Sequence, residues 1–306
     1  TSPLQHAPHL VHSNPILIIE LANSSTFNIL AAANSSLSST QLIRIAFVKI
    51  HRSKLSINLN SFILISLISE YSMKGQNWYQ EDFIANQYDE RRFSNGGQLI
   101  DFKEKQQVID LIDIFEGKKI LEIACGTARF GLMLAKLGAD VTGIDISKAM
   151  INMGRKKIPD SPLTGNLNFL YSDASSLPFK DSSFDIVLAM RFFHLTPHPE
   201  YFLPEMLRVS SDKVIFDTFN AYSARSLYNW ILPMDSKLHK NSDMFKLLLN
   251  TNAKSIRSTN DFFFPYGLYR KLPFLFAKGV KYLDSHMTST DIGKRFATVS
   301  YWSISI

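Results

Sequence analysis

The segment from Lys119 to Asp145 is the part of the chain that most constrains its fold. It opens with an apolar run, Lys119–Ala124, that is too short for a helix and is typical of a buried strand. Four small residues, 125–128, follow where the chain must turn sharply. Apolar residues at helical spacing over Phe130–Leu137 then precede a second buried run, Val141–Ile144. This order of strand, turn, helix and strand predicts part of a doubly wound parallel sheet.

The turn also indicates the kind of ligand. Asp145 ends the second strand about 20 residues after the turn, where such a sheet places the acid that binds ribose hydroxyls. A dinucleotide site needs further glycines to admit a pyrophosphate and to let the helix pack closely. Here the turn ends in Ala128 instead. Glu122 lies just before it, and an acid there repels a diphosphate but suits a positively charged amine. We therefore expect an adenosine-containing cofactor.

This stretch resembles motif I of the class I S-adenosylmethionine-dependent methyltransferases, an acid followed by three alternating glycines. The four motif positions are occupied by Glu122, Ala124, Gly126 and Ala128. Two of the glycines are therefore alanines, and alanine resists the positive φ that glycine adopts freely. We expect Ala128 in particular to narrow the turn.

The resemblance continues in order and spacing over roughly residues 86–220. A helix from Ser147 to about Lys157 precedes Asn168–Ala174, a strand that ends in Asp-Ala, and Asp181–Ala189 contains the Phe-Asp-x-Val strand. The chain is most similar to the type 11, ubiquinone-biosynthesis-like branch of the family. The resemblance implies a Rossmann-like α/β fold, a doubly wound and mostly parallel sheet of seven strands with an insertion after strand five, and S-adenosyl-L-methionine as cofactor.

The resemblance also implies roles for single residues. Asp145 would bind the two ribose hydroxyls, Asp173 the adenine amino group beside the Ala174 backbone, and Gly126 would lie under the methionine part. Tyr88 would cap the pocket from an N-terminal helix, although a solvated helix with an interior tyrosine fits its sequence equally well. The complete set of expected cofactor-binding residues is Tyr88, Glu122, Ala124, Gly126, Thr127, Arg129, Asp145, Ile146, Met150, Asp173, Ala174 and Met190.

Composition excludes several other classes. The net charge of +6 is scattered, so no basic face for nucleic acid is expected. The single cysteine, Cys125, rules out an intrachain disulfide framework and a cysteine-rich metal site, and we interpret it as a small residue that fits the turn rather than as a nucleophile. No apolar run reaches the roughly 18 residues expected of a spanning helix. We expect a cytoplasmic protein that binds no metal and whose oligomeric state the sequence leaves open.

The chain divides by composition near Met73. Residues 1–72 are rich in Ser, Asn, Leu and Ile and poor in acids, which is typical of an organellar transit segment or of an upstream extension that is not a folded part, and we favour the latter. Residues 73–306 form the expected methyltransferase domain. Residues 221–295 are expected to form an insertion or lid on the acceptor side.

The C-terminal part should complete the sheet. Val214–Phe219 is expected as strand five, and Ser255–Phe264 and Phe296–Ile304 as an antiparallel strand pair. The aromatic, basic stretch 262–276 between them fits an acceptor pocket or a membrane surface, but we favour a long loop that packs on the core.

Methyl transfer to a phenol, enol or amine also needs a base. His194 follows strand four at the carboxyl edge of the sheet and is the candidate, with packing of the loop as the alternative. Asp217 and Asn220 at the end of strand five would contact acceptor or cofactor, or serve as structural caps. We expect methyl transfer from S-adenosylmethionine to a small or lipid-like acceptor, with peripheral membrane contact left open. The alternatives are an NAD(P)-dependent oxidoreductase and a cofactor-binding protein without transferase activity.

Overall fold

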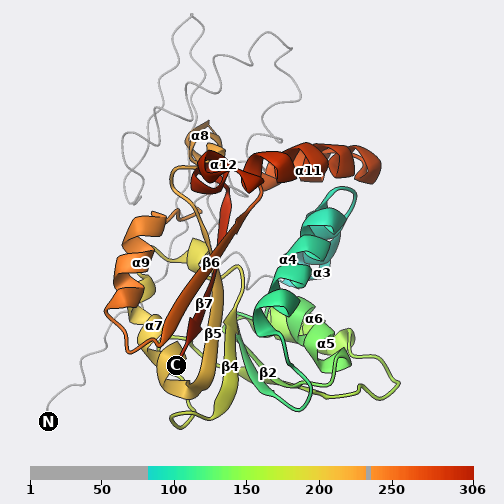
Figure 1. The fold of residues 1–306 in the computed structure, drawn as a ribbon. Helices are drawn as coiled ribbons and strands as arrows, with labels where there is room; N and C mark the ends of the chain where they lie inside the picture. Colours follow the sequence, from blue (N-terminus) through green and yellow to red (C-terminus); the bar gives the residue numbers. More distant parts are fainter. Residues whose placement is uncertain (1–81, 232–235) are drawn as a thin grey trace, which may run out of the picture. The chain divides into compact units, whose positions relative to one another are not determined.

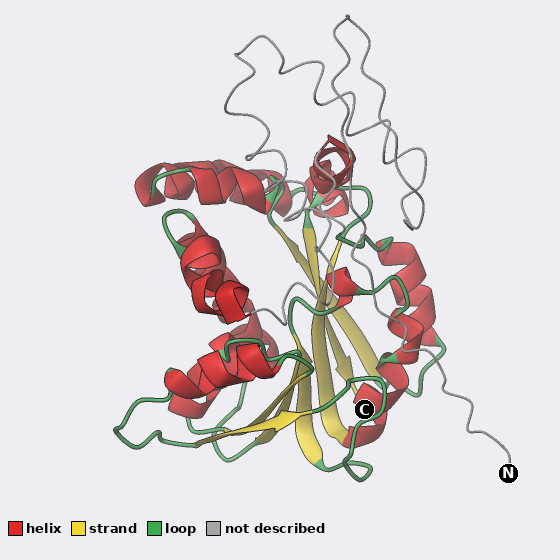
Figure 2. Cartoon of the chain, turned by 180° about the vertical axis from the view of Figure 1, so that it is seen from behind, coloured by secondary structure: helices red, strands yellow, loops and turns green. Residues whose placement is uncertain are grey.

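Seven strands form one sheet in the computed structural model, which describes residues 82–231 and 236–306. The predicted extension 1–72 lies outside the described residues. The strand order is β3-β2-β1-β4-β5-β7-β6, in which the first five strands are parallel and β7 runs antiparallel to both its neighbours (Figure 2). The strands are β1 Lys119–Ile123, β2 Asp140–Asp145, β3 Asn166–Tyr171, β4 Phe184–Ala189, β5 Ser210–Phe219, β6 Ser255–Asp261 and β7 Val299–Ser305. The predicted doubly wound, mostly parallel sheet of seven strands is confirmed.

Helices cover both faces of the sheet (Figure 1). Those described are α3 Asp82–Phe93, α4 Gly97–Ile112, α5 Arg129–Lys136, α6 Lys148–Lys156, α7 Leu203–Val209, α8 Ala224–Ile231, α9 Asn241–Leu249, α10 Tyr266–Lys271, α11 Phe274–Ser289 and α12 Asp291–Phe296, with 3-10 turns η2 Phe193–Leu195 and η3 Pro199–Tyr201. Successive strand residues point to opposite faces. Ile186 and Leu188 of β4 thus join the core under α4 and α5, whereas Val187 and Ala189 join the core under α7 and α9.

The carboxyl edge of the sheet gathers the segments of interest. β1 pairs with β2 on one side and with β4 on the other, so the strand order reverses between β1 and β4. In doubly wound sheets ligands bind outside the carboxyl ends of the strands at this switch point. The turn 124–128 after β1 and the loop 190–194 after β4 therefore lie at that position.

The expected long loop after β6 is wrong. The segment between β6 and β7 contains α10, α11 and α12, and the strands are shorter at this end than predicted, since β6 ends at Asp261 and β7 begins at Val299. Pro265 and Pro273 are the N-cap residues of α10 and α11, where the missing N–H breaks no helical hydrogen bond.

The predicted core packing of the aromatic stretch holds for part of it. Phe262, Tyr266 and Tyr269 are fully buried, and the Phe262 ring lies edge-on to the two tyrosines at centroid distances of 4.7 and 5.4 Å. Leu275 and Phe276, by contrast, are exposed on α11.

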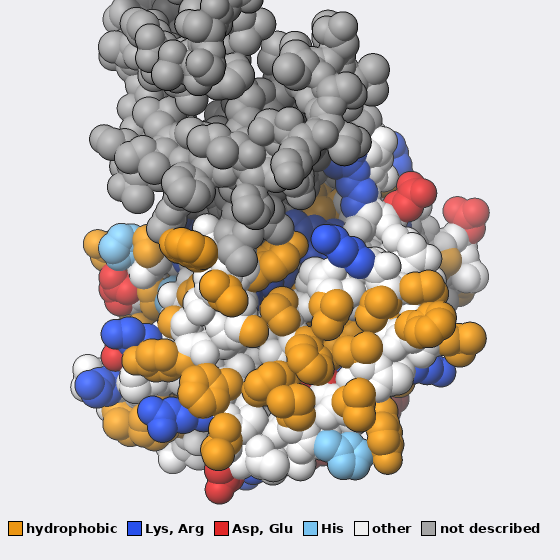
Figure 3. Space-filling view, turned by 90° about the horizontal axis from the view of Figure 1, so that it is seen from above, with side chains coloured by type: hydrophobic (Ala, Val, Ile, Leu, Met, Phe, Trp, Pro, Cys, Tyr) orange, Lys and Arg blue, Asp and Glu red, His pale blue; other side chains and the backbone are white. Residues whose placement is uncertain are grey.

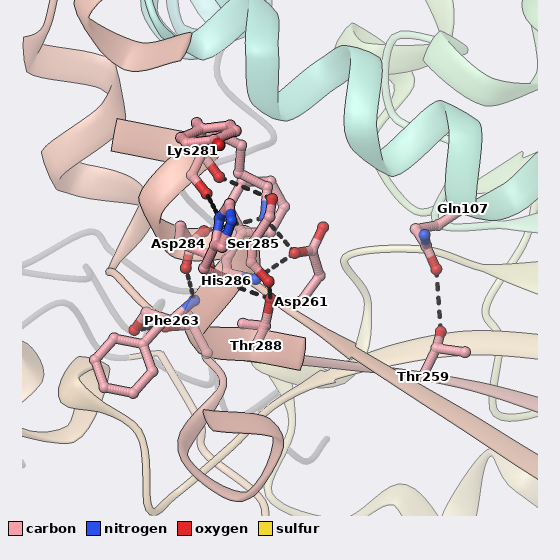
Figure 4. Close-up of polar contacts among 12 residues, drawn as sticks. Gln107, Thr259, Asp261, Phe263, Lys281, Asp284, Ser285, His286 and Thr288 are labelled. Carbon is pink, nitrogen blue, oxygen red and sulfur yellow. Dashed lines mark hydrogen bonds and ion pairs between the residues drawn. The ribbon is translucent and has the colours of Figure 1, made fainter. Parts of the chain in front are cut away.

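Helix α11 buries two charged residues, Lys281 and Asp284, and exposes several apolar ones. Asp284 is completely buried and accepts hydrogen bonds from the backbone N–H of Phe263, the Tyr269 hydroxyl and the Lys281 ammonium, at 2.5, 2.5 and 3.0 Å (Figure 4). Lys281 also forms an ion pair with Asp261 of β6. Figure 3 looks onto the molecule from the end where α11 and α12 lie and shows hydrophobic side chains over a broad area. Those exposed on these two helices are Leu275, Phe276, Tyr282, Leu283, Met287, Ile292 and Phe296.

Within residues 82–231 and 236–306, no helix has both the length and the apolar character needed to cross a membrane. The same residues contain no group of three or more His, Cys, Asp or Glu side chains placed to hold a metal ion.

Replacing Lys281 by Met should destabilise the fold by about 3–5 kcal/mol, because it leaves the buried carboxylate of Asp284 and the half-buried one of Asp261 without their cation. The matched control is Lys278→Met on the exposed side of the same helix, which should change the free energy of unfolding by less than about 0.5 kcal/mol. Urea denaturation followed by circular dichroism measures both. Equal midpoints for the two variants would contradict a structural role for the buried ion pairs.

Candidate functional site

The turn after β1 adopts a left-handed backbone at three of its residues. Ala124, Gly126 and Ala128 have φ values of 52°, 54° and 59°. A left-handed conformation costs an alanine roughly 1–2 kcal/mol, so the two alanines strain the turn but do not change its path. A Cβ at Gly126 would meet only the Ala124 carbonyl oxygen at 4.0 Å, so the turn leaves space beside this glycine for a ligand.

Asp145 holds this turn in place from the end of β2. Its carboxylate accepts the backbone N–H of Gly126 through Oδ2 and that of Ser147 through Oδ1, both at 2.8 Å. The side chain is largely buried, and burial raises the pKa of Asp145 above its ordinary value. Each carboxylate oxygen has a second lone pair, so Asp145 can also accept hydroxyl groups of a ligand.

Glu122 lies beneath the turn and is buried. Its Oε2 accepts the backbone N–H of Gly131 in the first turn of α5 at 2.8 Å, and a Cβ at Gly131 would lie 2.6 Å from the same oxygen. Burial raises the pKa of Glu122 to about 8. The carboxyl group therefore caps α5, and its ionisation at neutral pH depends on a positive charge coming near.

Helix α3 is attached to the turn by polar contacts that we did not anticipate. The Thr127 hydroxyl donates to Asp89 Oδ1 at 2.8 Å, and Lys157 forms an ion pair with Asp89 and donates to the Thr127 carbonyl at 3.0 Å. Tyr88 packs against Met150 at the start of α6, in a small cluster with two alanines. The cover of the cofactor site by Tyr88 stays a prediction.

Other predicted residues lie at the same edge with different contacts. Met150 and Met190 are buried, Ile146 is half-buried after β2, and Ala174 is buried. Asp173 follows β3 in a loop, is exposed, and accepts the Ser175 N–H at 2.8 Å.

Arg129 points away from the turn toward α4. Its guanidinium forms ion pairs with Asp101 at 2.8 Å and Glu104 at 2.6 Å, so its contacts are those of a structural residue. Cys125 is buried, and burial raises the pKa of its thiol well above the ordinary value, as expected of a small residue that fits the turn.

His194 lies in η2 after β4, with its ring 5.7 Å from that of Phe219. Its Nδ1 is buried without a hydrogen-bond partner. Burial and the nearby guanidinium groups of Arg191 and Arg225 hold the pKa of His194 well below 6.5. The imidazole is therefore neutral, and its protonated form is disfavoured.

Asp217 and Asn220, the two candidates at the end of β5, form hydrogen bonds with backbone groups. Asp217 Oδ1 accepts the Arg191 N–H at 2.5 Å and so holds Arg191 at its left-handed φ of 62°. Burial raises the pKa of Asp217 to about 6. The Asn220 side-chain amide donates to the carbonyls of Arg295 and Ala297, which favours the structural alternative for this residue.

The sequence interpretation missed two arginines. Arg225 on α8 lies over the ring of Phe219 at the end of β5, and Arg270 lies over the ring of Tyr266 on its own helix, α10. Nothing in their spacing along the chain indicates that they lie together.

Residues 121–216 match the family described as a methyltransferase domain. The chain therefore carries a class I methyltransferase domain. This confirms the predicted family and its cofactor, S-adenosylmethionine, and favours methyl transfer over the oxidoreductase alternative.

Curated relatives of this methyltransferase domain include two bacterial proteins. The demethylmenaquinone methyltransferase of Listeria welshimeri is 36% identical over 112 residues, which cover 35% of this chain and 46% of the relative. That of Renibacterium salmoninarum is 33% identical over 106 residues, 35% of this chain and 42% of the relative. The chain thus spans less than half the length of these relatives.

Solved structures share the fold of the methyltransferase domain. Phosphoethanolamine N-methyltransferase 2 of Haemonchus contortus superposes with a TM-score of 0.55 at 14% identity, over 77% of this chain and 59% of that one. A Thermotoga maritima methyltransferase, described as a possible histamine N-methyltransferase, gives 0.50 at 16% identity, over 74% and 99%.

The high pKa of Glu122 predicts a pH-dependent stability. The unfolded chain loses this proton near 4.5, but the native state keeps it up to about 8. The stabilising contribution is therefore complete below 4.5 and is lost as the pH rises through 8. Glu122→Gln keeps an acceptor for Gly131 and cannot ionise, so its free energy of unfolding should gain on the wild type as the pH rises across this window.

Urea denaturation at several pH values measures the difference. Glu116→Gln, at an exposed carboxyl group, is the control and should follow the wild type throughout. A wild type and a Glu122→Gln variant that change in parallel with pH would show that Glu122 is ionised in the native state.

Proposed function

We propose that this protein transfers the methyl group of S-adenosylmethionine to a small-molecule acceptor. The observation that carries the proposal is the turn at the switch point, where Asp145 holds Gly126 beside open space. The cofactor supplies an electrophilic methyl group on a positively charged sulfur, which becomes a neutral thioether as the methyl group leaves. The acceptor gains the methyl group and, if it is a phenol, an enol or a neutral amine, gives up a proton.

The residues of the chain fit these requirements. Asp145 would accept the ribose hydroxyls, Asp173 and the Ala174 backbone would bind the adenine, and Glu122 would place negative charge near the amine. Tyr88 would cover the site from α3. Holding the acceptor in line with the methyl group can lower the barrier by about 7–11 kcal/mol, so positioning is the main contribution of the protein.

The chemical identity of the methyl acceptor and its position in the fold are also proposals. The names of the curated relatives make a quinone-like ring a candidate. The segment 221–295, which contributes α8 and α10 at the end of β5, is proposed as the acceptor side. A cytoplasmic location and peripheral contact with a membrane stay predictions.

S-adenosylhomocysteine should stabilise the protein by about 2.7 kcal/mol at 100 times its dissociation constant. Asp145→Asn should weaken this binding about tenfold or more, because a neutral amide replaces a carboxylate that accepts hydroxyl groups. Thermal unfolding with increasing ligand measures both.

Asp185→Asn is the matched control. Asp185 also accepts a backbone N–H, from Lys119, but at the opposite edge of the sheet. This variant should lose stability and keep its ligand response. A protein stabilised by NAD and not by S-adenosylhomocysteine would overturn the proposal.

We propose His194 as the base that takes the acceptor proton. His194→Gln should lower kcat about 10²-fold and leave the affinity for S-adenosylhomocysteine unchanged. Because the pKa of His194 lies well below 6.5, wild-type kcat should show no inflection near that pH. Production of S-adenosylhomocysteine over a series of hydroquinones and phenols measures the rate.

A His194→Gln variant with the kcat of the wild type would exclude His194 as the base and leave packing of the loop as its role. A wild-type protein that binds S-adenosylhomocysteine and turns over none of these acceptors would favour the binding protein without transferase activity.

A further inference from the structure

Three arginines from distant parts of the chain meet at one pair of aromatic rings. The pair is Phe219, which ends β5, and Tyr266, which begins α10, with ring centroids 5.8 Å apart. Arg191 Cζ lies 4.3 Å from the Phe219 centroid and 5.0 Å from that of Tyr266. Arg225 Cζ lies 3.7 Å from Phe219, and Arg270 Cζ lies 5.9 Å from Tyr266. We call Arg191, Arg225 and Arg270 the arginine cluster.

The cluster contains polar atoms that lack hydrogen bonds. Buried side-chain nitrogen and oxygen atoms almost always have a partner, so exceptions need an explanation. Among the residues that the structure describes, five such atoms have none, and every arginine of the cluster contributes one. They are Arg191 Nη1, His194 Nδ1, Arg225 Nε, Asn229 Oδ1 and Arg270 Nε.

The three guanidinium groups of the cluster face two carboxylates, Glu104 and Asp217, both of which act on Arg191. Arg191 Nη1 lies 3.5 Å from Glu104 Oε1, but this carboxylate also binds Arg129, at 2.6 Å. Within the described residues, neither Arg225 nor Arg270 forms an ion pair with a carboxylate. Burial and the repulsion between neighbouring guanidinium groups lower the pKa of both to about 9.

We propose that the arginine cluster binds an anionic group of the methyl acceptor, a carboxylate or a phosphate. The inference rests on the proposed function and adds the chemical class of the acceptor. A guanidinium offers several N–H donors in a plane, the geometry that carboxylate and phosphate oxygens accept. A bound anion supplies the missing acceptors and relieves the repulsion.

The position of the arginine cluster favours the acceptor, rather than the cofactor, as the ligand that it binds. Arg191 follows β4, Phe219 ends β5, and Arg225 lies on the helix after β5. Most of the proposed cofactor residues lie in or just after β1, β2 and β3 instead. Tyr88 on α3 and Met190 after β4 are the exceptions. An acceptor held by its anionic group at the end of β5 would lie beside His194, whose ring is 5.7 Å from that of Phe219.

The test titrates the chain of residues 1–306, saturated with S-adenosylhomocysteine, with inorganic phosphate and separately with benzoate. Calorimetry at constant ionic strength gives the dissociation constants. Saturation with S-adenosylhomocysteine excludes binding at the position of the methionine carboxylate. The two probes distinguish a phosphate from a carboxylate site.

The wild type should bind at least one of the two anions. Arg225→Gln and Arg270→Gln should each weaken that binding about tenfold or more, because each removes a charged hydrogen-bond donor. Both variants should keep the wild-type affinity for S-adenosylhomocysteine. Arg257→Gln, at an exposed arginine of β6, is the matched control and should change neither affinity.

Thermal unfolding separates a ligand site from a structural one. Without anion, Arg225→Gln removes a repelling charge but also the hydrogen bond from Arg225 Nη2 to Ser236 Oγ, so the stabilisation that the anion adds is the deciding quantity. The anion should stabilise the wild type more than the variant.

Three results would overturn the inference. The first is a wild type that binds S-adenosylhomocysteine but neither anion. The second is anion binding that survives both substitutions. The third is anion binding that is seen without S-adenosylhomocysteine and is lost when S-adenosylhomocysteine is added. Absence of S-adenosylhomocysteine binding would instead reject the proposed function.

Discussion

The buried carboxylate of Glu104 connects the turn after β1, where the cofactor is proposed to bind, with the acceptor side at the ends of β4 and β5. It lies on α4 and contacts Arg129 at the start of α5, Arg191 after β4 and the Tyr266 hydroxyl of α10. Burial by itself would raise the pKa of Glu104, but the two guanidinium groups hold it below its ordinary value. The network therefore depends on an ionised carboxylate in the interior, which is stable only while its cations stay in place. α4, the turn after β1, the loop after β4 and α10 are positioned together by this one group.

The turn shows how a motif can lose glycines and keep its shape. We expected Ala128 to narrow the turn, but Ala124 and Ala128 both adopt the left-handed backbone that glycine would provide. The surrounding contacts determine this conformation. Asp145 holds the Gly126 amide, and Thr127 is bound through its hydroxyl and its carbonyl. The strain of a few kcal/mol is offset by these bonds, and strained backbone of this kind is common at ligand sites.

The residues of the site differ in how far the sequence could predict them. The contact between Asp145 and Gly126 could be anticipated because both residues belong to one strand-turn-helix-strand unit, whereas their binding of the cofactor stays a prediction. Arg129 was expected to bind the cofactor, but acids 25 and 28 residues earlier in the chain attract its guanidinium. The helices between β6 and β7 were missed because a proline can end a helix or precede one, and the sequence pattern did not decide between the two.

The sequence by itself determined the order of the strands along the chain, the turn at the switch point and the class of cofactor. Each of these depends on residues that lie close together in the chain. Tertiary structure decided the rest. It brought Arg191, Arg225 and Arg270 to the rings of Phe219 and Tyr266, and it placed Glu104 against Arg129 and Arg191. Charges that lie tens of residues apart carry no periodic pattern, and they become neighbours only when the helices pack at the carboxyl edge of the sheet. The acceptor side, where the inferred anion would bind, therefore became visible only in the folded chain.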